Sequence, residues 1–113
     1  LFSTNEWHLI GFTFNAGTLK LYVDAVEDTN VTKVDDAAIT TIHNSAADIT
    51  FGGYLGDGSL VNGSDGLHDE IGLWNTELSS SEISTLYNGG DGEQYPFGIT
   101  DSGANSFFSF GGI

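Results

Sequence analysis

The sequence predicts an all-β fold, an antiparallel β-sandwich with one short helix near residues 79–88. Apolar and polar residues alternate over 7–14, 19–24 and 67–74, which is the period of a half-buried strand. The chain holds 16 glycines and 1 proline, a balance that suits short strands joined by tight turns. Only one segment carries both a start signal and a stop signal for a helix.

The first two alternating runs predict a β-hairpin. Residues 7–14 and 19–24 flank the turn-forming segment Asn15-Ala16-Gly17-Thr18. One face of this hairpin is expected to be buried. The residues expected to form that face on the first strand are Ile10, Phe12 and Phe14.

The middle of the chain alternates short apolar runs with polar stretches. We expect an edge strand near Val34 and short strands at 39–42 and 49–53. Residues 56–66 contain so many glycines and short polar residues that they predict a long surface loop. Loops of this kind are where sandwich proteins usually carry function.

The helix is predicted after the strand at 67–74. Ser79-Ser80-Ser81-Glu82 has the spacing of a capping box, and Asn88-Gly89-Gly90 provides a left-handed stop. Beyond it, residues 98–113 read as an apolar C-terminal strand or tail. Phe107, Phe108 and Phe110 would be an aggregation hazard if exposed, so a final strand or a partner surface should cover them.

The charge is strongly negative, with 16 acidic residues, 2 lysines, no arginine and a net charge of −14. Nucleic-acid binding depends on Lys and Arg, so we expect no nucleic-acid partner. No segment is long and apolar enough for membrane insertion. Solubility, adaptation to high salt and cation binding are all compatible with this charge.

Three segments in order carry a resemblance to a known family. Residues 5–24, Asp65–Asn75 and 78–90 resemble the central hairpin, late strand and short helix of laminin-G-like domains, in the concanavalin-A-like lectin and glucanase superfamily. The family often has Asp-Gly where this chain has Asp24-Ala25. The resemblance implies a concanavalin-A-like jelly roll over residues 1–97 that lacks its N-terminal strands. Those strands lie outside this sequence or come from another chain.

The resemblance implies a non-catalytic recognition module that binds a neutral glycan or a protein ligand. It would be extracellular, at the cell surface or on a virion, because residues 86–97 resemble a segment of phage-type laminin-G-like domains. The alternative is a structural decoration or appendage subunit that packs against other subunits of a surface or virion assembly. The apolar tail favours this alternative.

We expect that the protein is not an enzyme. Glucanases of this superfamily need two carboxylates on one strand face, about 5–5.5 Å apart for retention. Asp69 and Glu70 are adjacent in the predicted strand, so their side chains point to opposite faces. Gly72 and Trp74 follow Glu70 at alternate positions, and neither is an acid or a nucleophile.

The candidate site lies in the glycine-rich loop. Asp57, Asn62 and Asp65 offer the hard oxygen ligands that Ca²⁺ prefers, and this stretch is similar to the calcium loop of pentraxins. With Tyr54, the same three residues are the candidates for ligand binding. The alternative is that Asp57 and Asp65 only stabilise turns.

Three further residues are assigned structural roles. Trp7 and Trp74 are expected in the core rather than as sugar platforms. Asp69 is expected to tie down a neighbouring loop, because it shares a predicted apolar row and a carboxylate there needs hydrogen bonds. The other members of that row are Leu67, Ile71 and Leu73.

Overall fold

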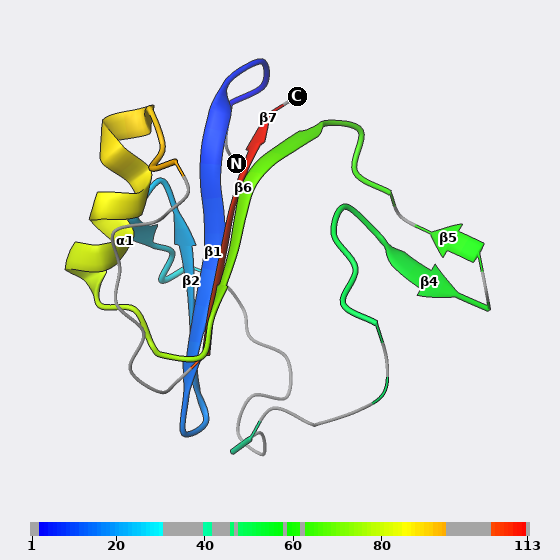
Figure 1. The fold of residues 1–113 in the computed structure, drawn as a ribbon, viewed down its shortest axis with the longest axis horizontal. Coiled ribbons are helices and arrows are strands. Elements are labelled where there is room, and N and C mark those ends of the chain that lie inside the picture. Colours follow the sequence, from blue (N-terminus) through cyan, green and yellow to red (C-terminus); the bar gives the residue numbers. More distant parts are fainter. Residues whose placement is uncertain are drawn as a thin grey trace.

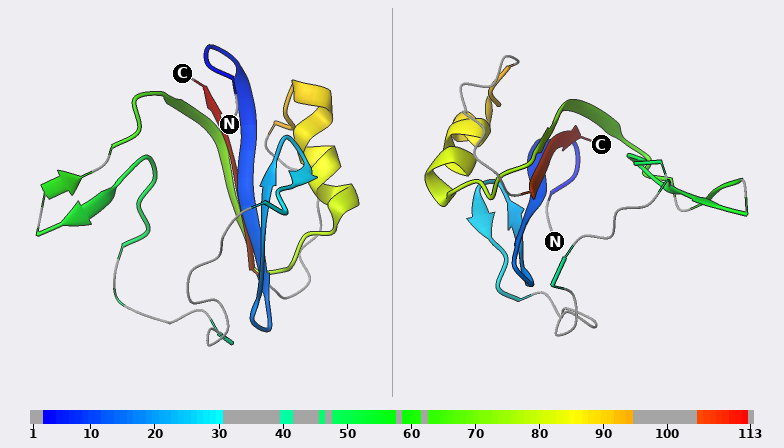
Figure 2. Two further views of the ribbon diagram at one scale, coloured as in Figure 1. Left: turned by 180° about the vertical axis from the view of Figure 1, so that it is seen from behind. Right: turned by 60° about the horizontal axis from the view of Figure 1, so that its bottom comes forward.

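A computed structural model describes residues 3–30, 40–41, 46, 48–57, 59–61, 63–94 and 105–112. The main element is a five-stranded antiparallel sheet with the strand order β3-β2-β1-β7-β6. Its strands are β1 (Trp7–Asn15), β2 (Thr18–Val23), β3 (Val26–Glu27), β6 (Leu67–Trp74) and β7 (Asn105–Gly112). Helix α1 (Ser80–Tyr87) lies on one side of the sheet, and the separate hairpin of β4 (Tyr54–Gly56) and β5 (Ser59–Val61) projects on the other (Figures 1 and 2).

The antiparallel strands and the single short helix of the predicted fold are confirmed. The β1–β2 hairpin closes on a two-residue turn, in which Ala16 has a φ of 46° and Gly17 a φ of 90°. The capping box of α1 is complete, since the Ser79 hydroxyl accepts from the Glu82 N–H and the Glu82 carboxylate accepts from the Ser79 N–H at 2.7 Å. The Ser79 hydroxyl also donates to the Glu82 carboxylate at 2.6 Å, and this hydrogen bond, with the smaller effect of the Ser79 N–H, lowers the pKa of Glu82. The described residues contain one large sheet and one two-stranded sheet, so the sandwich and jelly roll stay predictions.

The C-terminal strand β7 lies inside the sheet, between β1 and β6. It pairs with β1 from Trp7 to Phe14 on one side and with β6 on the other. The last strand of the sequence therefore joins β1 to β6, two strands that do not pair with each other. A final strand at this end of the chain was one of the two predicted outcomes.

The main core lies between the sheet and α1. Leu9, in β1, is 1% exposed, and Ile83, in α1, is 0% exposed. The other buried members of this cluster are Tyr22, Trp74, Leu78 and Leu86. The face predicted to be buried on β1 is the opposite one, and Ile10 on that face is 38% exposed although Phe14 is buried. That prediction is wrong in part because α1 covers the Leu9 side.

Two predictions for the middle of the chain are also wrong. Residues 49–53 form bends and coil where a strand was predicted. Residues 56–66 include the second half of the β4–β5 hairpin instead of a continuous loop. Asp57 lies in the tight turn of this hairpin, and the residues on either side of the turn pair as Gly56 with Ser59. The predicted strands near Val34 and at 39–42 fall on residues that are mostly outside the described ones.

The turn between β2 and β3 carries backbone strain that a substitution can test. Asp24 and Ala25 form this two-residue turn, with φ values of 51° and 66°, and alanine in the left-handed region costs about 1–2 kcal/mol. Ala16, in the β1–β2 turn, is strained in the same way, with a φ of 46°. Ala16→Gly is therefore expected to raise the free energy of unfolding by about 1 kcal/mol. Ala25→Gly should raise it less, because Ala25 also packs against the core. Urea unfolding measures both, and a loss of stability in both variants would contradict the turn geometry.

Candidate functional site

Asp57 lies in the tight turn of the projecting β4–β5 hairpin. Its φ is 51°, in the left-handed region that Asp adopts more readily than most residues. Gly56 pairs with Ser59, so Asp57 belongs to a two-residue turn. This geometry supports the turn-stabilising role that the sequence left open for Asp57.

Asp65 lies in the segment that returns from this hairpin to β6, and it is exposed. The neighbouring Ser64 fixes this segment, because its N–H donates to the Gly52 carbonyl at 2.6 Å. The Ser64 hydroxyl also lies 2.8 Å from Nε2 of His68. The surroundings of Asp65 are therefore held by backbone and hydroxyl contacts.

The calcium prediction is not tested by this part of the chain. Asn62 and the side chain of Tyr54 lie outside the described residues. Within the described residues, no three His, Cys, Asp or Glu side chains gather in a way that could hold a metal ion. Ca²⁺ at Asp57, Asn62 and Asp65, with Tyr54 as a further binding residue, stays a prediction.

Trp74 is a core residue. It is 8% exposed and belongs to the cluster under α1. Its indole lies back over Gly72, where an added Cβ would come within 2.6 Å of Cζ3 and 2.9 Å of Cζ2 of the ring. The ring of Trp74 therefore covers Gly72, the alternate position after Glu70 at which a second carboxylate would be needed for a glucanase.

The predicted apolar row on β6 is wrong beyond residue 69, because a β-bulge interrupts the strand. Asp69 pairs with Phe110 and Gly72 with Phe108, so Glu70 and Ile71 together oppose a single residue of β7. The φ of Glu70 is 48°, in the left-handed region. The side-chain alternation therefore shifts by one residue within the bulge.

Asp69, the last paired residue before the bulge, lies on the α1 side of the sheet. Its partner in β7 also pairs with Leu9, which faces α1, whereas the partner of Leu73 pairs with Phe12 on the opposite face. The Asp69 Oδ1 atom accepts a hydrogen bond from the Glu70 N–H at 2.9 Å. This side chain therefore stabilises the bulge itself, and it is exposed rather than buried in an apolar row.

Asp69 also lines a cleft on the α1 side of the sheet, which we call the Trp7 cleft. It encloses about 370 Å³ between the start of β1, the bulge of β6 and the loop after α1. Trp7 was expected in the core, but it is 45% exposed. The residues that line the Trp7 cleft are Trp7, Asp69, Glu70, Gly90, Asp91, Gly92 and Gln94.

The loop after α1 is held by backbone hydrogen bonds. Asn88 ends the helix with a φ of 48°, and the following glycines continue in the left-handed region. The Gly92 N–H then donates to the Tyr87 carbonyl at 3.1 Å, and the Glu93 N–H donates to the Leu86 carbonyl at 2.9 Å. This wall of the Trp7 cleft is therefore built in advance of any ligand.

The chemistry of the Trp7 cleft is one aromatic surface beside carboxylates and an amide. Asp69, Glu70 and Asp91 provide hydrogen-bond acceptors, and Gln94 provides both donors and acceptors. Such a combination can hold a ligand that has both an apolar face and polar hydrogens.

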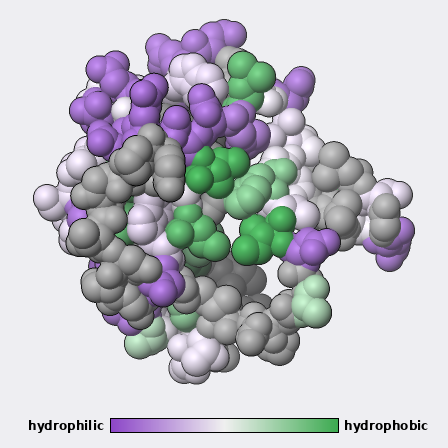
Figure 3. Space-filling model, in the orientation of Figure 1, coloured by the Kyte–Doolittle hydropathy of each residue, from purple (hydrophilic) through white to green (hydrophobic). Residues whose placement is uncertain are grey.

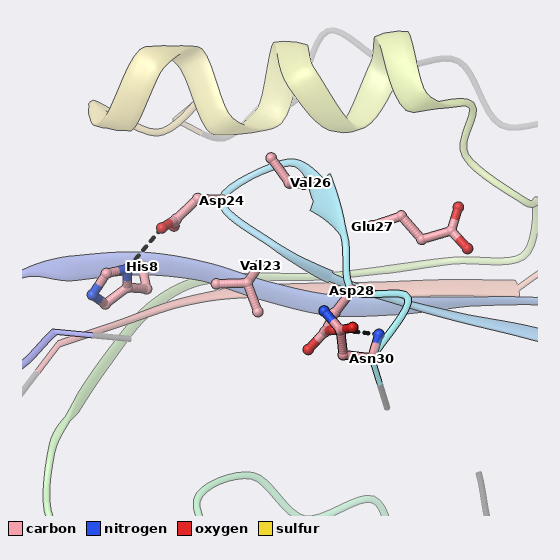
Figure 4. A pocket seen from close by; sticks show the side chains of 7 residues that line it. All are labelled: His8, Val23, Asp24, Val26, Glu27, Asp28 and Asn30. Carbon is pink, nitrogen blue, oxygen red and sulfur yellow. Dashed lines mark hydrogen bonds and ion pairs between the residues drawn. The ribbon is translucent and has the colours of Figure 1, made fainter. Parts of the chain in front are cut away.

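A second pocket lies beside the β2–β3 turn, and we call it the His8 pocket. It encloses about 400 Å³, and its lining residues are His8, Val23, Asp24, Val26, Glu27, Asp28 and Asn30. Figure 4 shows His8 and Val23 on the side of β1 away from α1, while the Glu27 carboxylate points away from the His8–Asp24 pair. Its polar groups therefore do not converge on one point.

His8 and Asp24 form a structural tie in this pocket. The His8 Nδ1 atom donates to Asp24 Oδ2 at 2.8 Å, and Asp24 Oδ1 accepts from the Leu9 N–H at 3.0 Å. The hydrogen bond to Asp24 raises the pKa of His8 above its usual 6.5; burial opposes this, and the charge of Asp24 adds to it. The pair joins β1 to the β2–β3 turn.

Ser3, His8 and Asp24 lie in the order of a catalytic triad, but His8 is not placed as a base. Its Nε2 lies 3.2 Å from the Ser3 hydroxyl and 3.2 Å from the Ser3 carbonyl oxygen, which can only accept a hydrogen bond. A donor at Nε2 satisfies this carbonyl, and a raised pKa favours that protonation. The arrangement fits a cationic tether rather than a nucleophile with its base.

Asp91 and Gln94 were not among the predicted site residues. The glycine-rich stop after the helix is visible in the sequence, and it marks a tight turn that exposes its neighbours. Nothing local in the sequence links this turn to Trp7, which lies at the other end of the chain. The link depends on β7 lying between β1 and β6.

The comparisons with known proteins give one match. The family model described as the concanavalin A-like lectin/glucanases superfamily, of laminin G type, matches residues 1–84. Neither a curated protein nor a solved structure matches the chain. The matched region ends before residues 86–97, so the phage-type resemblance of that segment stays a prediction.

Proposed function

The chain belongs to the laminin G-like group of the concanavalin A-like lectin/glucanase superfamily, and we propose that it binds carbohydrate through the Trp7 cleft without catalysing a reaction. Members of this superfamily are commonly non-catalytic binding modules, and laminin G-like domains are usually extracellular. We extend the proposal to display outside the cell or on a virion. None of the helices in the described residues has the length and hydropathy to cross a bilayer.

The observation that carries the proposal is the exposed indole of Trp7 inside a cleft. A tryptophan that is 45% exposed offers a flat apolar surface to the C–H face of a sugar ring. Asp69, Glu70 and Asp91 can accept hydrogen bonds from sugar hydroxyls, and hydrogen bonds to ionised acceptors are among the stronger ones. The pre-built loop after α1 lowers the ordering cost of binding.

Trp7→Ala is expected to weaken glycan binding about tenfold or more, because the stacking surface is lost. A glycan array identifies the ligand, and isothermal titration then gives the affinity of parent and variant. Val26→Ala is the matched control, since Val26 is 69% exposed at the opposite edge of the sheet. An array without any hit, or equal affinity in the parent and Trp7→Ala, would refute the proposal.

A second candidate function rests on the sheet face away from α1. Ile10 and Ile71 are each 38% exposed there, and Leu73 is 61% exposed. Figure 3 shows hydrophobic side chains gathered around a hollow in the middle of the view, where Figure 1 places β6 and the chain leading to β4. Apolar surface of this kind favours a structural subunit that packs against another chain.

Leu73→Glu tests this candidate. A subunit of an assembly should form oligomers whose size rises with concentration, and a carboxylate on the apolar face should dissociate them because it loses its hydration on burial. Light scattering behind a sizing column measures the mass over a range of concentrations. A monomer at all concentrations would contradict a self-assembling subunit, and Leu67→Glu, on the other face of the same strand, is the control.

A further inference from the structure

The Trp7 cleft has an excess of negative charge. Three of its lining residues are carboxylic acids, Asp69, Glu70 and Asp91, and none of the lining residues is basic. A concave site lined by charges of one sign concentrates their potential at the position of the ligand. A neutral sugar would use these groups only as hydrogen-bond acceptors.

The one lysine in the described residues does not line this cleft. The protein has 2 basic residues apart from histidine, both lysines, in a net charge of −14. Lys20 lies at the far end of the β1–β2 hairpin, where its Nζ is 3.5 Å from Glu77. Lys33 is outside the described residues. The carboxylates of the Trp7 cleft are therefore well placed to receive a positive group from a ligand.

We infer that the glycan bound in the Trp7 cleft carries free, protonated amino groups, as oligomers of glucosamine do; the inference rests on the proposed carbohydrate recognition. The ammonium group has three N–H donors for the carboxylates. The indole of Trp7 attracts the same cation through its π face while it stacks on the sugar ring. Sulfated and uronic glycans are repelled, because their charge has the same sign as the cleft.

Hydrogen bonds hold the residues of the Trp7 cleft in place. Asp69 is fixed by the hydrogen bond from the Glu70 N–H, at 2.9 Å. The loop that carries Asp91 is fixed by the bond from the Gly92 N–H to the Tyr87 carbonyl, at 3.1 Å. Charges on a fixed frame discriminate between ligands better than charges on mobile chains, because a mismatched ligand cannot be accommodated.

The test compares two oligosaccharides that differ only in whether their amino groups are free or acetylated. Isothermal titration is carried out with a short glucosamine oligomer and with its fully N-acetylated counterpart, at about pH 6, where the amino groups of the first oligomer are protonated. The free-amine oligomer is expected to bind about tenfold more tightly, and this advantage should shrink as salt is added. Equal binding, or tighter binding of the N-acetylated oligomer, would overturn the inference.

Variants separate the cleft from the overall charge of the protein. Asp69→Asn with Asp91→Asn should remove most of the preference for the free amine, measured as the ratio of the affinities for the free-amine and the N-acetylated oligomer. Asp28→Asn, which removes one charge in the His8 pocket, should leave the preference unchanged. A preference that survives the double variant would assign it to the net charge of −14 and overturn the inference.

The remaining outcomes distinguish this inference from the proposed function. If other glycans bind and depend on Trp7 but the free-amine oligomer does not, the proposed function stands and the inference fails. If no glycan binds, both fail. Tighter binding of a short polylysine than of the glucosamine oligomer would show that the cleft recognises an amine without its sugar, and would also overturn the inference.

Discussion

Gly72→Ala is expected to lower the free energy of unfolding by about 3 kcal/mol, at the upper end of the range for overpacked cores. The new methyl group would lie 2.6 Å from Cζ3 of Trp74, far inside van der Waals contact. The ring cannot move aside easily, because it belongs to the buried cluster with Leu78 and Ile83. Thermal and urea unfolding measure the loss, which corresponds to about 10 °C or more in melting temperature for a domain of this size.

Two controls show whether the collision is the cause. Gly89→Ala has no atom within 4 Å of its Cβ but has a φ of 65°, so it should cost only about 1 kcal/mol of backbone strain. In a Trp74→Leu background the ring is absent, and Gly72→Ala should cost at least about 1 kcal/mol less than in the parent. The same cost in both backgrounds would contradict the packing of Trp74 over Gly72.

The parts of the fold that local sequence determines are the parts that could be predicted. The β1–β2 hairpin follows from alternation and from the turn around Gly17, and α1 follows from the Ser79–Glu82 capping box. In each case the residues that form the element lie within a few positions of those that start or stop it. Both elements can therefore be predicted without knowledge of the rest of the chain.

The bulge of β6 could not be predicted because nothing in the alternation signals it. Residues 67–74 read as a regular strand, and Glu70 has no intrinsic preference for its φ of 48°. The pairing with β7 fixes this conformation, and β7 lies more than thirty residues further along the chain. The wrong facing of Ile71 and Leu73 follows from this one inserted residue.

The candidate cleft was missed for the same reason. Trp7, Asp69 and Asp91 come from three separate segments, and they meet because β7 joins β1 to β6 while the loop after α1 returns toward them. The sequence pointed instead to Asp57 and Asp65, which share one loop and look close in the chain. That site stays a prediction, and proximity in sequence cannot reveal a cleft such as this one, whose residues meet across strands.

Asp24→Ala is expected to lower the free energy of unfolding by about 2–4 kcal/mol. It removes the acceptor for the Leu9 N–H at 3.0 Å and the partner of His8 Nδ1 at 2.8 Å, and His8 is 8% exposed. It also places alanine at a φ of 51°, where aspartate is better tolerated. Asp24→Asn should cost less, because an amide oxygen can still accept from Leu9 and asparagine tolerates the same φ.

The pH dependence of stability separates the lost charge from the lost hydrogen bond. The folded pKa of His8 is raised above its usual 6.5, so the pair stabilises the fold fully below 6.5, and this contribution disappears as the pH rises through the folded pKa. In Asp24→Asn this decline should flatten, and the His8 pKa measured by NMR should fall. Asp91→Asn, the same change at an exposed carboxylate, should keep the decline. An unchanged His8 pKa in Asp24→Asn would contradict the tie between β1 and the β2–β3 turn.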